Sequence, residues 1–166
     1  MMVICINGSI NSGKSTIARQ LAEHLPGARF VEGDDHDGHE LPFEQMIAYA
    51  VQRLAAIIAE TRETLVIAYP LRETDFAILR DVASRRGLRL LVVTLAPPLE
   101  VALGQRGVRP LDDGERARVR EMYSEGYHAR AFSDLIIGGA PAPEAVVAEI
   151  VELTALRPGS SAPGGE

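Results

Sequence analysis

The sequence predicts an α/β fold in which a parallel β-sheet is covered by helices on both faces. Short apolar runs alternate along the chain with longer segments whose apolar residues recur at helical spacing, a pattern typical of parallel sheets. The chain also opens with an apolar run at 3–6 that leads into the glycine-bearing segment 8–15 and then into an amphipathic segment. A strand, a glycine turn and a helix in this order form the first unit of such a sheet.

Five apolar runs are the expected strands, and most are apolar without interruption, as strands covered on both faces should be. Their ranges are 3–7, 29–32, 65–69, 88–95 and 135–137.

Six segments are the expected helices, with ranges 14–24, 43–60, 75–86, 98–106, 114–131 and 143–156. Proline and glycine mark several of their ends. Pro98 and Pro143 suit a first helical turn, and Gly87 is a helix stop. Asp112 followed by Glu115 forms a capping box in which Asp replaces Ser or Thr.

Composition sets the class of protein. The 166 residues are 46% hydrophobic and 24% charged, which is ordinary for one soluble domain. We expect this domain to span 1–156 and a flexible, apolar-poor tail to span 157–166. No apolar run approaches about 18 residues, so we expect no membrane span, and with no visible secretory signal we expect a cytoplasmic protein. The net charge of −6 argues against a nucleic-acid partner.

The segment Gly8–Ser15 reads G-x-x-x-x-G-K-S, the P-loop motif. Its glycines allow backbone torsions that point successive N–H groups at a phosphate, and the following helix adds its unpaired N–H groups. Lys14 can reach the β- and γ-phosphates of a nucleotide, and the Ser15 hydroxyl can ligate Mg²⁺. The expected nucleotide-binding residues are Gly8, Asn11, Ser12, Gly13, Lys14, Ser15 and Thr16.

A cluster of carboxylates follows the second predicted strand. Asp34 and Asp35 come just past its carboxyl end, the edge at which open α/β sheets bind ligands. Either carboxylate could accept a proton from an alcohol acceptor or hold Mg²⁺ through water. We take Asp34 as the candidate base and metal residue, and Asp35 as a candidate substrate contact. The alternative is a solvated acidic loop that caps the next helix.

Three arginines are further candidates. Arg72 follows the third predicted strand, where a guanidinium can pair with a carboxylate or phosphate of the acceptor. Arg106 and Arg109 lie in a Gly- and Pro-bearing segment between two predicted helices. Such a segment can close over the phosphates and stabilise charge on the transferring group. The alternatives are surface roles: a loop residue for Arg72 and Arg109, and a helix C-terminal cation for Arg106.

Together these motifs resemble the small P-loop kinases: shikimate kinase, gluconate kinase, adenylylsulfate kinase and the nucleoside monophosphate kinases. The resemblance covers nearly the whole chain in element order. It rests on the P-loop, the acidic segment 33–35, the Arg106/Arg109 segment and the stretch 138–144, which is similar to the loop that packs against adenine.

The resemblance implies a three-layer P-loop kinase fold with a five-stranded parallel sheet of order 2-3-1-4-5. It implies an acceptor-binding region at about 34–60 and a lid at about 106–116. It also implies ATP as co-substrate, Mg²⁺ as cofactor and a small polar or anionic acceptor, with Asp34 at the position of the catalytic base or Mg²⁺-linked aspartate.

The chain departs from each individual family. The segment 69–72 is similar to the nucleoside monophosphate kinase turn, but Ala68 replaces the acidic residue expected before it. This departure supports a second interpretation, a P-loop nucleotide-binding module without kinase turnover. A regulatory GTPase is a third interpretation, but Asp35-x-x-Gly38 follows the P-loop too soon and no Asn-Lys-x-Asp motif is present.

Overall fold

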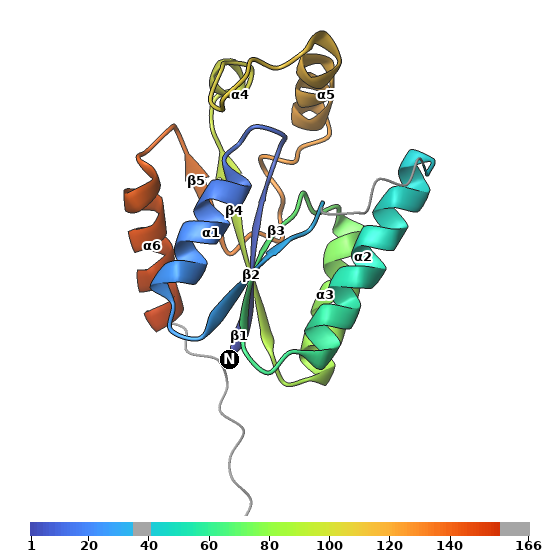
Figure 1. Cartoon of the computed structure of the whole chain (residues 1–166), viewed down its shortest axis with the longest axis vertical. Helices are drawn as coiled ribbons and strands as arrows, with labels where there is room; N and C mark the ends of the chain where they lie inside the picture. The colour runs from blue at the N-terminus through green and yellow to red at the C-terminus, as the bar shows by residue number, and fades with distance from the viewer. Residues whose placement is uncertain (35–40, 157–166) are drawn as a thin grey trace, which may run out of the picture.

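The computed structural model describes residues 1–34 and 41–156, and Figure 1 shows its three layers. All neighbouring strands pair in parallel, in the order β2-β3-β1-β4-β5, as the resemblance implied. The strands are β1 (Met2–Gly8), β2 (Ala28–Glu32), β3 (Thr64–Ala68), β4 (Arg89–Ala96) and β5 (Leu135–Gly138). No helix in this part of the chain is long and apolar enough to cross a membrane.

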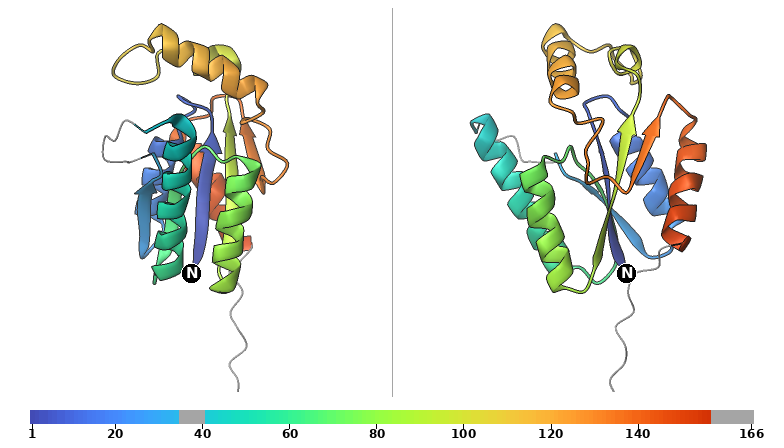
Figure 2. Two further views of the ribbon diagram at one scale, coloured as in Figure 1. Left: turned by 90° about the vertical axis from the view of Figure 1, so that its right-hand side faces the viewer. Right: turned by 180° about the vertical axis from the view of Figure 1, so that it is seen from behind.

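The helices divide between the two faces of the sheet and its upper edge. They are α1 (Lys14–His24), α2 (Phe43–Glu60), α3 (Glu73–Arg85), α4 (Leu99–Ala102), α5 (Asp113–Ser124) and α6 (Pro143–Leu156). Helices α1 and α6 cover one face, and α2 and α3 cover the other (Figure 1). Helices α4 and α5 lie beyond the carboxyl ends of the strands, and the two views of Figure 2 agree on this placement.

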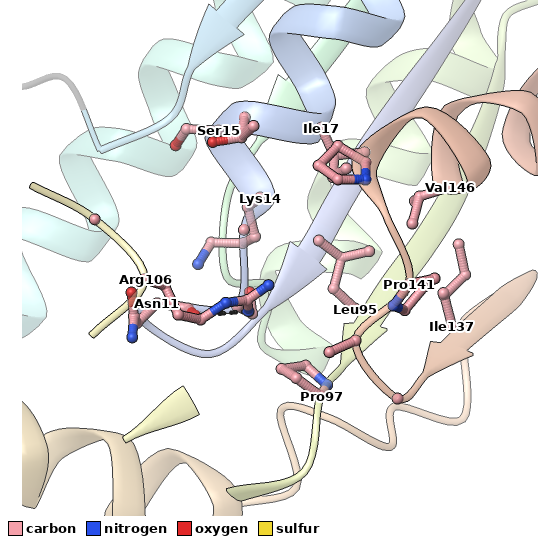
Figure 3. Close-up of a pocket in the computed structure, with 17 residues that line it drawn as sticks. Asn11, Lys14, Ser15, Ile17, Leu95, Pro97, Arg106, Ile137, Pro141 and Val146 are labelled. Carbon is pink, nitrogen blue, oxygen red and sulfur yellow. Dashed lines mark hydrogen bonds between the residues drawn. The ribbon is translucent and has the colours of Figure 1, made fainter. Parts of the chain in front are cut away.

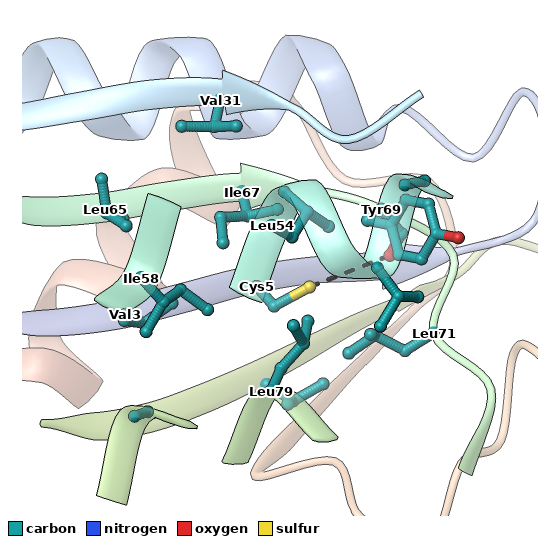
Figure 4. Close-up of a cluster of buried hydrophobic side chains, with 14 of the residues drawn as sticks. Val3, Cys5, Val31, Leu54, Ile58, Leu65, Ile67, Tyr69, Leu71 and Leu79 are labelled. Atoms are coloured by element: carbon teal, nitrogen blue, oxygen red, sulfur yellow. Dashed lines mark hydrogen bonds between the residues drawn. The ribbon is translucent and has the colours of Figure 1, made fainter. Parts of the chain in front are cut away.

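The apolar side chains of the central strand, β1, point alternately into two hydrophobic cores, one on each face of the sheet. Val3 and Cys5 of β1 pack into the core under α2 and α3, which Figure 4 shows, while Ile4 and Ile6 pack into the core under α1 and α6. Successive side chains of a strand point to opposite faces, so a strand covered on both sides must be apolar throughout. Burial raises the pKa of the Cys5 thiol to about 12, so Cys5 is a packing residue.

Two helices end earlier than their sequence pattern predicts. The helix predicted over 98–106 spans only Leu99–Ala102. Its last carbonyl groups are taken by distant side chains: the Asn11 amide donates to the carbonyl oxygens of Ala102 at 2.8 Å and Gly104 at 2.9 Å. The prediction of a helix reaching residue 106 was wrong because it did not include this distant hydrogen-bond donor.

The helix predicted over 114–131 spans Asp113–Ser124. Gly126 adopts a φ of 77°, and the Tyr127 N–H bonds back to the carbonyl oxygen of Met122 at 3.1 Å. A left-handed glycine of this kind terminates a helix, so the extension to residue 131 was wrong. At the other end, Asp112 and Glu115 form the predicted capping box.

A buried asparagine ties the central strand to the loops around the site. The Asn7 side chain accepts from the Leu71 N–H at 2.8 Å and donates to the Thr94 hydroxyl at 2.9 Å and the Tyr127 carbonyl at 3.3 Å. Thr94 in turn bonds to Ser133 at 2.6 Å. One fully buried amide therefore fixes the segments that follow β3 and α5 against the end of β1.

We predict that Asn7→Ala lowers the free energy of unfolding by about 3 kcal/mol, because it leaves buried donors and acceptors of Leu71 and Thr94 without their partner. Urea unfolding followed by circular dichroism measures the change. The control, Gln52→Ala on the exposed side of α2, stays within about 0.5 kcal/mol of wild type. A loss for Asn7→Ala no larger than that of the control would contradict this account of the loops.

Candidate functional site

The P-loop follows β1 through a turn that only glycine permits. Gly8 has a φ of 149°, and a Cβ there would lie 2.6 Å from the Ser12 hydroxyl oxygen and 2.8 Å from the Leu95 carbonyl oxygen. Asn11 at φ 60° and Gly13 at φ 99° are also left-handed. This winding carries the loop around the end of the central strand and begins α1 at Lys14.

The P-loop lines a cavity of about 360 Å³, which we call the nucleotide cavity. The predicted residues Asn11 to Thr16 lie along it, whereas Gly8 lies beneath the turn and shapes it from below. The opposite end of the cavity is formed by Gly139, Ala140, Pro141 and Pro143, within the stretch 138–144. Figure 3 shows Asn11, Lys14 and Arg106 at one end and Ile137, Pro141 and Val146 at the other. A polar end and an apolar end suit a phosphate chain and a base.

Lys14 is almost fully buried at the base of the P-loop. Its ammonium nitrogen donates to the Ser9 carbonyl oxygen at 2.6 Å. Burial lowers the pKa of Lys14, while the charges of Asp34 and Glu32 act in the opposite direction. A cation already removed from water interacts more strongly with an anion than an exposed one does.

The serines of the P-loop fit a phosphate and its metal. The Ser12 hydroxyl oxygen is buried and has no hydrogen-bond partner among residues 1–34 and 41–156. A buried hydroxyl costs free energy unless it is paired, so its environment favours a ligand oxygen. Ser15 lines the same cavity and offers the hydroxyl that P-loops use for Mg²⁺. In the described part of the chain, no three carboxylate, histidine or cysteine side chains gather to hold a metal by themselves.

The lid arginines separate in the structure. Arg106 lines the nucleotide cavity and donates to the Asn11 carbonyl oxygen at 3.1 Å. Arg109 does not line this cavity, because its guanidinium forms a two-pronged pair with the Glu115 carboxylate at 2.7 and 2.8 Å. The predicted catalytic role of Arg109 therefore requires that it leave Glu115, and it stays a prediction.

A second cavity, of about 220 Å³, lies on the other side of the P-loop. Its lining includes Ile10 of the loop together with the predicted residues Asp34 and Arg72. Asp34 follows Gly33, where a Cβ would lie 2.6 Å from the Tyr69 ring, so β2 and β3 can end this close together only with glycine there. The predicted substrate residue Asp35 lies outside the described residues.

Sequence analysis did not single out most of the apolar residues that line the two cavities, although the region of about 34–60 that the resemblance assigns to the acceptor contains those of α2. In the nucleotide cavity these include Leu95, Pro97, Ile137 and Val146. In the second cavity they include Phe43, Met46, Ile47, Pro70 and Met122, beside the phenols of Tyr69 and Tyr127. Leu95 and Ile137 are the last residues but one of β4 and β5, so the common edge of the parallel strands could have indicated them. The residues from α2 and α5 depend on how these helices pack.

The sequence matches no protein-family model and no curated protein. Solved structures do match. A sugar kinase from Janibacter sp. HTCC2649 has a TM-score of 0.71 at 20% identity, over 95% of this chain and 96% of that one. An APS kinase from Mycobacterium tuberculosis, solved with AMPPNP and APS, has a TM-score of 0.65 at 19% identity, over 93% and 97%. A shikimate kinase from Acinetobacter baumannii, solved with shikimate, has a TM-score of 0.66 at 22% identity, over 95% of each chain.

The fold is that of the small P-loop kinases. The fold class and the resemblance predicted from the sequence are thereby confirmed.

We predict that Arg109→Ala raises the pKa of Glu115. Hydrogen bonds from Arg109, and secondly from the Asp112 N–H, lower this pKa to about 2 from its ordinary value of 4.5. Without Arg109 the pKa rises but stays below 4.5, because the Asp112 N–H remains. A depressed folded-state pKa adds stability above pH 4.5, and this contribution is lost as the pH falls toward 2. Carboxyl-detected NMR titration measures the pKa, and Glu115→Gln assigns the signal.

The same titration in the presence of ATP tests the role predicted for Arg109. If Arg109 moves to the phosphates, the pKa of Glu115 rises in the wild type as it does in Arg109→Ala. A pKa near 2 with and without ATP would show that Arg109 stays on Glu115 and takes no part in phosphate binding.

Proposed function

We propose that the protein is an ATP-dependent kinase that transfers the γ-phosphoryl group of ATP to a hydroxyl or phosphate group of a small molecule. ATP occupies the nucleotide cavity and the acceptor occupies the second cavity. The observation that carries the proposal is that the P-loop separates the two cavities, with Lys14 in one, Asp34 in the other, and an electrostatic interaction between them.

This arrangement suits phosphoryl transfer, which requires positioning and charge stabilisation more than covalent chemistry. Lys14 and the loop amides hold the β- and γ-phosphates, and Arg106 stabilises charge on the transferring group. Asp34 faces the acceptor side, where it orients or deprotonates the attacking hydroxyl. Arg72, the remaining candidate at this edge, lines the acceptor side.

Mg²⁺ fits the residues on the nucleotide side. The Ser15 hydroxyl and the phosphate oxygens are the hard oxygen ligands that Mg²⁺ prefers, and Asp34, from the acceptor side, would hold one of the water molecules that this ion retains. When bound, the ion neutralises charge on the phosphates.

A nucleotide-binding module without turnover is the second candidate. Strand β3 ends in Ala68, which is followed by Tyr69, so neither residue supplies the carboxylate expected there. Burial raises the pKa of Tyr69, which keeps its phenol neutral and unable to replace a carboxylate. The two candidates differ in one measurable property: only the kinase releases ADP in response to an added acceptor.

We predict that ATP with magnesium binds with measurable heat in isothermal titration calorimetry, and that Lys14→Ala weakens this binding by about 10- to 100-fold. The substitution removes charge-assisted hydrogen bonds to the phosphates, each worth about 1.5–3 kcal/mol. Arg85→Ala, which removes an exposed cation of α3 paired with Asp81, is the matched control and leaves the affinity unchanged. No heat for ATP with the wild type would exclude both candidates.

We predict that Asp34→Asn lowers turnover by about 100-fold or more while ATP affinity changes little, because the amide cannot accept a proton. A coupled ADP-release assay over alcohols and nucleoside monophosphates identifies an acceptor and then measures kcat. Asp81→Asn on α3 makes the same chemical change at an exposed position and keeps wild-type turnover. Wild-type turnover in Asp34→Asn would remove Asp34 from catalysis, and ATP binding without acceptor-dependent ADP release would favour the module.

A further inference from the structure

The second cavity indicates which class of molecule it takes, an inference that rests on the kinase proposal above. An arginine at this sheet edge suggests an anionic acceptor when the sequence alone is read. In the structure, however, the described lining of the cavity is mainly apolar and aromatic, and each of its arginines is already paired. Anion recognition by arginine needs a free face of the guanidinium group.

Arg72 is held from two sides. Its Nε and one terminal nitrogen donate to the two carboxylate oxygens of Asp75 at 3.1 and 3.2 Å. The other terminal nitrogen donates to Glu44 at 3.0 Å. The Asp75 side chain is only 3% exposed and closes the capping box of α3, so its pairing with Arg72 is part of the helix terminus. The hydrogen bond to Asp75, together with that to Glu44, raises the pKa of Arg72 despite partial burial.

Arg118 of α5 is also paired with carboxylates, through a single terminal nitrogen. One terminal nitrogen donates to Glu121 at 2.7 Å and to Glu125 at 2.8 Å. Its guanidinium carbon lies 5.3 Å from the centre of the Phe43 ring, so the group also rests on an aromatic face. The two carboxylates offset the charge of Arg118, and the Phe43 ring covers one face of its guanidinium, so its attraction for an anionic ligand is weakened.

The charged side chains that line the second cavity and its surroundings carry a net negative charge. A smaller opening beside the second cavity is lined by Phe43, Arg72, Arg118 and Tyr127, which both share, and by Glu44, Glu121 and Glu125. The described residues that line these two spaces carry five carboxylates and two guanidinium groups, and a third guanidinium, that of Arg130, lies 4.2 Å from the centre of the Tyr127 ring. The five carboxylates are those of Asp34, Glu44, Asp75, Glu121 and Glu125. Such an excess attracts cations and repels anions.

The apolar part of the lining sets a second requirement for the acceptor, which must have an apolar body. Met46, Ile47 and Met122 line the cavity beside the rings of Phe43 and Tyr127. The pKa of Tyr127 is raised by burial, so its phenol is neutral. Phe43 is 52% exposed although it belongs to this lining and Arg118 lies over one face of its ring, so the exposed part of the ring is available to an apolar group or to an ammonium ion.

We propose that the acceptor is an amphiphilic amino alcohol: an apolar body that carries the hydroxyl to be phosphorylated, a basic amine, and no anionic group. The apolar body lies against Phe43 and Met46, the hydroxyl faces Asp34, and the ammonium group faces Glu44, Glu121 and Glu125. Arg72 and Arg118 orient these carboxylates, which makes them positioning residues and not anion-binding residues.

Three probes that share one scaffold and differ in a single substituent, which is cationic, neutral or anionic, test this proposal. They are 3-amino-2-phenylpropan-1-ol, 2-phenylpropan-1-ol and tropate, which share a phenyl ring and a primary hydroxyl and carry an aminomethyl, methyl or carboxylate group. Protein-observed NMR titration without nucleotide measures each affinity. We expect the amine to bind about tenfold more tightly than tropate, with the neutral alcohol between them. Equal or tighter binding of tropate, or no shift of cavity residues with any probe, overturns the proposal.

Variants of the exposed carboxylates test whether these groups cause the preference for the amine over tropate. Glu44→Gln combined with Glu121→Gln removes two carboxylates at positions that are 75% and 60% exposed, and leaves Arg72 paired with Asp75 and Arg118 paired with Glu125. We expect the preference for the amine over tropate to fall at least threefold in this variant. Glu149→Gln on the exposed side of α6, across the sheet, changes the same charge and keeps the wild-type preference. An unchanged preference in the double variant overturns the assignment to these carboxylates.

These titrations contain no nucleotide, so they separate the two proposals. An amine preference in a protein that gives no heat with ATP supports the charge inference and overturns the kinase. A tropate preference in a protein that releases ADP leaves the kinase standing and overturns the inference.

Discussion

The site depends on how closely the end of β1 approaches β4. The backbone of Gly8 pairs with Leu95, and the Leu95 carbonyl oxygen occupies the space in which any side chain at position 8 would begin. The chain can leave the central strand at this point only through the left-handed turn of the P-loop, and the turn places Lys14 at the first position of α1. A displaced turn would leave the Lys14 ammonium buried without the Ser9 carbonyl, and an unpaired buried charge costs several kcal/mol. The close contact between β1 and β4 therefore fixes the turn that gives the buried Lys14 ammonium its hydrogen-bond partner.

Much of this arrangement was predictable because local pattern and sheet geometry agree. Helix α2 has the bounds predicted from its apolar period, and the five strands fall within a few residues of their apolar runs. Since all the strands are parallel, their carboxyl ends meet at one edge, and this rule alone brings the P-loop, Asp34 and Arg72 together. The stretch 138–144 begins at the last residue of β5 at the same edge, and Gly139, Ala140, Pro141 and Pro143 line the nucleotide cavity with the P-loop.

What sequence reasoning missed depends on partners that are distant along the chain. The carboxylate of Glu44 pairs with Arg72 because α2 packs beside α3, and no local pattern gives this packing. From the sequence, Asn7 is only the last residue of an apolar strand. In the structure its side chain forms three hydrogen bonds: to Leu71 after β3, to Thr94 within β4 and to Tyr127 after α5. Helix α4 ends early for the same reason, since its carbonyl groups bond to the P-loop. Arg109 fits a phosphate contact by position, and only the structure reveals the competing Glu115 six residues along the chain.

Helix α5 connects the two cavities physically. Arg116 donates to the Leu103 carbonyl oxygen at 2.8 Å, in the segment whose neighbouring carbonyls bind Asn11 on the nucleotide side. Two residues later, Arg118 lies in the lining of the second cavity. Positions separated by two on a helix point in different directions, so one rigid helix holds the segment beside the P-loop through Arg116 and lines the second cavity through Arg118. A shift of α5 therefore alters both linings at once, while Asn7 and the Tyr127 carbonyl resist that shift at the base of the helix. The charge arrangement on the acceptor side and the fit of the nucleotide side are thus properties of the same element.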